Sequence, residues 1–66
     1  MRHIKNRIKE MRQNTSLTQE DLANKINVSR QTIIAIEKGN YTPSLLLAFQ
    51  IAKEFNMKVD EVFWIG

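Results

Sequence analysis

The chain has 66 residues, 42% of them hydrophobic, a formal net charge of +3, one histidine and no cysteine. This length suits one domain, and the missing cysteines exclude disulfides and thiolate metal sites, as expected of a protein from a reducing cytoplasm. No apolar run approaches the roughly 20 residues of a membrane span, and no signal-peptide pattern opens the chain.

The first predicted element is a basic amphipathic helix. Ile4, Ile8 and Met11 recur at i, i+4 and i+7, which is the apolar stripe of a helix. Residues 1–12 carry five cations against one acidic residue, whereas residues 44–66 carry two cations against three acidic residues. This asymmetry would turn the basic end toward a polyanion, although an ordinary solvated helix face has the same pattern.

Two short helices joined by a tight turn are predicted between Thr18 and Glu37. Thr18 is a suitable N-cap for the first of them. Ala23, Asn27 and Ile33 supply the small residue, the left-handed turn residue and the apolar anchor of a helix-turn-helix. One polar helix face of this pair is left without an internal role, which points to DNA.

The remaining chain predicts two further helices. The fourth is expected to open at Thr42-Pro43, a cap followed by proline at the first helical position. Its expected buried stripe is Leu45, Ala48, Ile51, Ala52 and Phe55. A short last helix is expected at about residues 59–63. With only two glycines and one proline in the chain, the pattern predicts an all-α unit of five helices.

The segment LTQEDLANKINVSRQTIIAIEKGNYTPSLLLAFQIAKEFN resembles the small single-domain members of the Xre/Cro-repressor family. The residues at the family spacing are Gln19, Ala23, Val28-Ser29-Arg30, Ile33, Ile36-Glu37-Lys38-Gly39 and Pro43-Ser44-Leu45. The resemblance implies one compact, lambda-repressor-like DNA-binding domain over residues 1–66, with its helix-turn-helix at about 19–37. The small relatives also suggest a short two-stranded β element formed by Val62–Ile65 and Met1–Ile4.

Five residues of the third helix are candidates for reading bases. Arg30, Gln31 and Thr32 lie in its first turn, the part that typically enters the major groove. Arg30 suits the O6 and N7 atoms of guanine, and Gln31 suits the N6 and N7 atoms of adenine. Thr32, with Ile34 or Ala35, suits a thymine methyl. The alternatives are a solvated polar face for Arg30 and Gln31, and packing or a partner contact for Ile34.

The family resemblance also implies residues that position the protein on DNA. Gln19, at the start of the second helix, is expected against a phosphate. The other candidate backbone contacts are Ser29, Lys38, Asn40, Tyr41, Thr42 and Arg7. Arg12 and Glu37 match a pair that forms a salt bridge between the first and third helices in the family.

The C-terminal third holds more apolar side chains than a small monomer easily buries. The predicted homodimer interface consists of Leu46, Leu47, Phe49, Phe63, Trp64 and Ile65. A two-fold dimer would place paired recognition helices about 34 Å apart on a palindrome. The alternative is that Leu47, Phe63 and Trp64 cap the monomer core.

The predicted function is a sequence-specific regulator of transcription, a repressor that binds double-stranded DNA. The alternatives are the antitoxin of a toxin–antitoxin pair and a protein-only interaction module. Catalysis is not expected, because the neighbouring carboxylates of Glu20-Asp21 and Asp60-Glu61 diverge by about 100° on a helix and no glycine-rich phosphate loop occurs. No cofactor, metal or membrane is implied.

Overall fold

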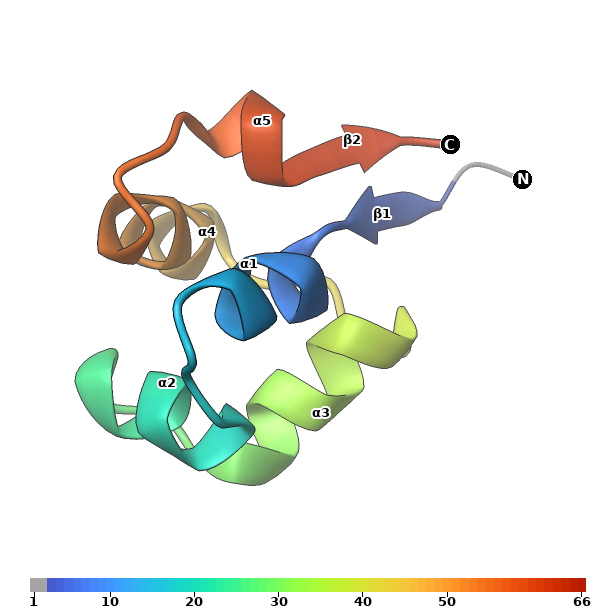
Figure 1. The fold of residues 1–66 in the computed structure, drawn as a ribbon. Coiled ribbons are helices and arrows are strands. Elements are labelled where there is room, and N and C mark those ends of the chain that lie inside the picture. The colour runs from blue at the N-terminus through green and yellow to red at the C-terminus, as the bar shows by residue number, and fades with distance from the viewer. Residues whose placement is uncertain (1–2) are drawn as a thin grey trace.

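The computed structural model describes residues 3–66 as five helices and a two-stranded antiparallel sheet (Figure 1). The elements are β1 (Ile4–Asn6), α1 (Ile8–Asn14), α2 (Gln19–Lys25), α3 (Arg30–Lys38), α4 (Leu45–Glu54), α5 (Val59–Val62) and β2 (Phe63–Ile65). The predicted five-helix fold with a terminal β element is confirmed. Within residues 3–66, no helix has the length and apolar character needed to cross a membrane.

The N-terminal segment corrects one prediction. Ile4 belongs to β1, and α1 begins only at Ile8. In the sheet Ile4 pairs with Ile65, which lies at the other end of the chain. A helical stripe read from local spacing cannot detect such a distant partner, and for this reason the expected helix was too long at its start.

The two chain ends pair as the small relatives suggest, but the strands are Ile4–Asn6 and Phe63–Ile65, and Val62 is the last residue of α5. The predicted N-terminal strand was Met1–Ile4; Met1 and Arg2 lie outside the described residues, and the observed strand continues to Asn6. The backbone N–H of Arg7 then donates to the carbonyl of Val62 at 3.1 Å. This hydrogen bond joins the start of α1 directly to the end of α5.

The helix-turn-helix forms as its sequence predicts. The Thr18 hydroxyl accepts from the Asp21 backbone N–H at 3.0 Å, and the Asp21 carboxylate accepts from the Thr18 N–H at 3.0 Å. This reciprocal capping box starts α2. Asn27 holds the turn at φ 59°, and Gly39 ends α3 at φ 80°.

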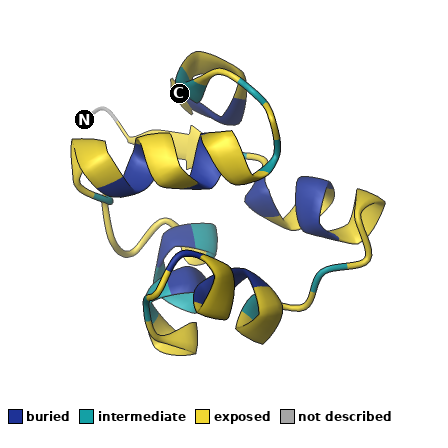
Figure 2. Cartoon of the chain, turned by 90° about the vertical axis from the view of Figure 1, so that its left-hand side faces the viewer, coloured by how far each residue is buried: buried dark blue, intermediate teal, exposed yellow. Residues whose placement is uncertain are grey.

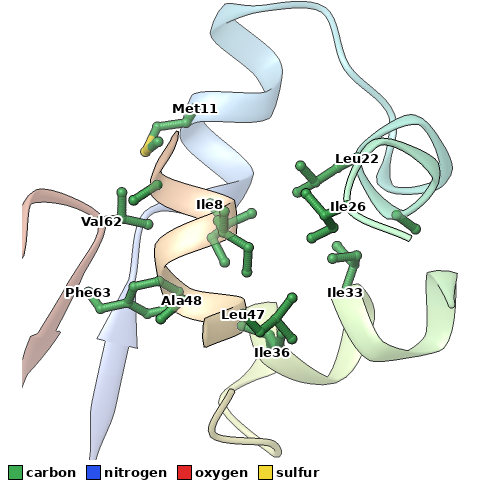
Figure 3. Close-up of a cluster of buried hydrophobic side chains, with 13 residues drawn as sticks. Ile8, Met11, Leu22, Ile26, Ile33, Ile36, Leu47, Ala48, Val62 and Phe63 are labelled. Carbon is green, nitrogen blue, oxygen red and sulfur yellow. The ribbon is translucent and has the colours of Figure 1, made fainter. Parts of the chain in front are cut away.

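The core lies between the helices and is made of thirteen buried side chains (Figure 3). The largest completely buried ones are Ile8, Leu22, Ile33, Ile36, Ile51 and Val62. Figure 2 shows the buried residues on the inward sides of the helices and the exposed residues on their outer sides. Burying one such aliphatic side chain contributes about 1.5–3 kcal/mol, so these contacts hold the helices in place.

Helix α4 begins later than predicted. Its N-cap is Ser44, whose hydroxyl accepts from the Leu47 N–H at 3.1 Å, and Thr42-Pro43 precedes the helix. Leu45 was expected in the core but is 72% exposed, whereas Leu47 is 8% exposed. Positions i and i+2 of a helix point in directions about 200° apart, so Leu45 points outward when Leu47 points inward.

Candidate nucleic-acid interface

The first turn of α3 presents two exposed polar side chains next to a capped helix start. Ser29 caps the helix, since its hydroxyl accepts from the Thr32 N–H at 3.1 Å. The hydroxyls of Ser29 and Thr32 are also 2.9 Å apart and hydrogen-bonded. Arg30 and Gln31 are exposed beside this cap. Both side chains are free to meet base edges, while the Thr32 hydroxyl is engaged.

The other candidate base readers are less accessible. Thr32, Ile34 and Ala35 are each half-buried. On the inward side of α3, Ile33 and Ile36 are at most 1% exposed and anchor the helix in the core. The exposed polar side chains of the helix are therefore Arg30 and Gln31 in its first turn and Lys38 at its end.

A buried ion pair ties α3 to α1. The Arg12 Nε donates to Glu37 Oε2 at 2.7 Å, and Arg12 Nη2 donates to Glu37 Oε1 at 3.1 Å. The two side chains are 10% and 8% exposed. Arg12 also donates to the Leu17 carbonyl at 3.0 Å, which fixes the segment leading into α2. The predicted salt bridge is confirmed as a structural contact.

Glu37 also fixes Gln19 at the start of α2. The Gln19 Nε2 donates to Glu37 Oε1 at 3.2 Å. A side-chain amide has two N–H donors, so one remains for a phosphate oxygen. One carboxylate thus sets the positions of α1, of α3 and of the side chain expected at the DNA backbone.

The remaining candidate backbone contacts lie on the surface. Ser29, Lys38, Asn40, Tyr41 and Thr42 are all exposed, and most of them follow the last turn of α3. Arg7 is exposed as well, with its guanidinium 4.9 Å from the centroid of the Trp64 ring. Sequence reasoning missed this cation–π contact, because the pairing of β1 with β2 creates it.

The predicted dimer interface divides into two groups. Leu47 and Phe63 are in the monomer core at 8% exposed each, which corrects their assignment to an interface. The exposed members are Leu46, Phe49, Trp64 and Ile65, joined by Leu45. Leu46 and Phe49 also line a cleft of about 690 Å³ between α4 and α5.

The side chains of residues 3–66 include no cluster of three or more histidines and carboxylates arranged to hold a metal ion. The exposed groups at the first turn of α3, Arg30 and Gln31, are a cation and an amide that both donates and accepts hydrogen bonds. Such groups are suited to binding a polyanion with readable edges.

Comparison with known proteins agrees with this geometry. The helix-turn-helix family model matches residues 8–62. An HTH-type transcriptional regulator of Methanocaldococcus jannaschii is 62% identical over 60 residues, which are 91% of each chain. The transcriptional repressor of the cryptic phage CTXphi from Vibrio cholerae is 34% identical over 56 residues, which are 85% of this chain and 50% of that protein.

A solved structure extends the similarity to three dimensions. The restriction-modification controller protein C.AhdI from Aeromonas hydrophila has a TM-score of 0.75 to this chain and is 26% identical to it. The match covers 82% of each chain.

Proposed function

This chain belongs to the helix-turn-helix family of DNA-binding transcriptional regulators, which are not enzymes, and we propose that it is a repressor that binds a palindromic operator as a homodimer. The observation that carries the proposal is the first turn of α3. Its polar side chains, Arg30 and Gln31, are exposed on a helix that the core and the Arg12–Glu37 pair hold rigidly.

In the proposed complex this turn lies in the major groove. Arg30 donates two hydrogen bonds to guanine O6 and N7, and Gln31 forms a paired contact with adenine N6 and N7. Thr32, Ile34 and Ala35 contact thymine methyl groups at the edges of the same site. Because the helix backbone is already rigid, binding costs rotamer entropy of about 0.5–1.5 kcal/mol for each immobilised side chain but no ordering of the backbone.

The backbone contacts set the register of the helix on the duplex. Gln19 is positioned by Glu37 for one phosphate, with the N-terminus of α2 behind it. On the other side of α3, the proposed contacts are the exposed Lys38, Asn40, Tyr41 and Thr42. Ser29 and Arg7 complete the proposed set. These contacts give affinity without sequence preference.

A homodimer is supported by the apolar side chains that the fold leaves exposed. Leu46 and Phe49 of α4, with Trp64 and Ile65 of β2, form the proposed interface. A two-fold pair would read two half-sites in successive major-groove turns, about 34 Å apart. Repression is supported by the relative from Vibrio cholerae, whose name describes it as a transcriptional repressor.

Selection of bound duplexes from a random pool tests the proposal. We expect an inverted repeat whose half-sites are centred about 10–10.5 base pairs apart, or a multiple of that distance. A pool that shows no enrichment, although the protein is folded, would contradict DNA reading. Enrichment of a single half-site would contradict the dimer alone.

A further inference from the structure

A second cleft, lined mainly by polar residues, lies beside the C-terminal end of α3. It has a volume of about 360 Å³, and its walls come from β1, from the last turn of α3 and from Trp64 of β2. Figure 1 shows β1 and the C-terminal end of α3 on the same side of the molecule. We call it the strand cleft; its polar lining residues are His3, Lys5, Asn6, Glu37 and Lys38.

The strand cleft carries an excess of positive charge. Lys5 and Lys38 are exposed lysines, and within residues 3–66 neither takes part in an ion pair. The one carboxylate in the lining is Glu37, which already accepts hydrogen bonds from Arg12 and Gln19. The cations of the cleft are therefore left to attract an external anion.

The arrangement of the sheet limits how far Lys5 can move. Lys5 pairs with Trp64 across the two strands, so both side chains stand on one face of the sheet. The stem of Lys5 crosses Gly66 so closely that a Cβ atom at Gly66 would lie 2.6 Å from the Lys5 Cδ. Packing of the stem leaves the ammonium group at the surface and reduces the entropy that it loses on binding.

The length of α3 indicates which anion reaches the strand cleft. Lys38 follows Arg30 by eight residues, which is about 12 Å along the helix axis. The major groove is also about 12 Å wide. When the first turn of α3 lies on base edges, its last turn therefore comes close to the sugar-phosphate backbone that borders the groove.

We propose that the strand cleft binds a phosphate of the DNA backbone, so that the two-stranded sheet is part of the DNA interface. Lys5 and Lys38 neutralise the phosphate, and His3 adds a hydrogen bond at its edge, whereas the Asn6 side chain is held in the wall of the cleft by its hydrogen bonds to Ile36 and Ile8. The inference rests on the proposed function, and it extends the DNA contacts beyond the helix-turn-helix to a strand formed by the opposite end of the chain.

The salt dependence of binding to a random-sequence duplex tests this assignment. Each phosphate that a protein cation neutralises contributes about −0.9 to the slope of log K against log salt. Lys5→Gln is expected to make the slope shallower by about 0.9 and to weaken binding roughly eightfold at about 0.1 M salt. Lys5→Arg keeps the charge and is expected to keep the wild-type slope.

The matched control is Lys25→Gln, which removes one lysine charge from the end of α2 and breaks only an exposed ion pair with Glu54. This variant is expected to keep the wild-type slope. Circular dichroism of all variants checks that each is folded, and Lys5→Arg reports on the site if Lys5→Gln is not folded, because a loss of slope in that variant contradicts the proposal.

Four results would overturn the inference. An unchanged slope for Lys5→Gln, or an equal loss for Lys25→Gln, would show that no phosphate sits in the strand cleft. Binding of inorganic phosphate to the cleft of the wild-type protein that leaves its DNA affinity unchanged at constant ionic strength would assign the cleft to a free phosphate. Failure of the wild-type protein to bind any duplex would overturn the proposed function as well.

Discussion

Glu37 is the residue on which the largest number of functional positions depend. It accepts hydrogen bonds from Arg12 and from Gln19, and thereby connects α1, α2 and α3. The chain contains a second ion pair, Lys25–Glu54, with a separation of 3.6 Å and side chains 49% and 30% exposed. A comparison of the two pairs therefore separates the effect of burial on stability from the effect of charge pairing.

We predict that Glu37→Ala lowers the free energy of unfolding by about 3–5 kcal/mol, because it leaves the Arg12 guanidinium buried without its partner. Glu54→Ala is expected to cost about 0.2–1 kcal/mol, since its pair is screened by water. Urea unfolding followed by circular dichroism measures both. Equal losses would show that the buried pair has no special role.

At the residue scale, some of the contacts that support this site are predictable from the sequence. Asn27 was assigned to the tight turn because asparagine tolerates positive φ, and its φ is 59°. The Arg12–Glu37 pair was predicted from family spacing alone. The Arg7–Trp64 contact was not, because it needs the register of β1 against β2, which no local pattern encodes.

At the scale of elements, the capping box that starts α2 contributes to the response of the helix-turn-helix to acid. The N–H of Thr18 donates to the Asp21 carboxylate, and this hydrogen bond holds the pKa of Asp21 below its ordinary value of 3.8. A pKa that is lowered in the folded state stabilises the protein at pH values above 3.8. This stabilisation is lost as the pH falls through the lowered pKa.

Asp21→Asn is therefore expected to lower the Tm near neutral pH, because the charged acceptor of the Thr18 N–H is gone. The difference in Tm from wild type should shrink as the pH falls below 3.8. Asp60→Asn, which removes an exposed carboxylate from the first turn of α5, is the control and should change Tm less. A difference that stays constant across this pH range would contradict the assigned cause.

The bounds of the elements were predictable where caps are local and unpredictable where partners are distant. The start of α2 follows from Thr18 and Asp21, three residues apart. For α4, Thr42-Pro43 and Ser44 both offer a plausible local start, and the structure uses Ser44, whose hydroxyl accepts from the Leu47 N–H. The late start of α1 depends on a distant partner, because Ile4 pairs with Ile65 in the sheet.

At the scale of the whole molecule, apolar side chains remain on the surface of α4. Phe49 is 56% exposed and lies beside Leu46 in the cleft between α4 and α5. We predict that Phe49→Asp converts the proposed dimer to a monomer, because it places a charge in an apolar contact. Sedimentation equilibrium measures the mass, and Asn24→Asp, exposed on α2, is the control.

A dimeric mass that persists in folded Phe49→Asp would place the interface elsewhere. A monomeric mass for the wild-type protein, with and without a palindromic duplex, would contradict the dimer altogether. The measured masses thus distinguish a dimer interface from single exposed apolar residues, which are common on small proteins.

The central claim is that the first turn of α3 reads bases, and the most direct test is the affinity of Arg30→Ala for operators with single base-pair substitutions. The account predicts a loss of about 1–3 kcal/mol and the disappearance of preference at one base pair in each half-site. Lys38→Ala, by comparison, should weaken binding to every sequence about equally. If Arg30→Ala also lowers affinity for all sequences by the same factor, Arg30 contacts the backbone and the claim is wrong.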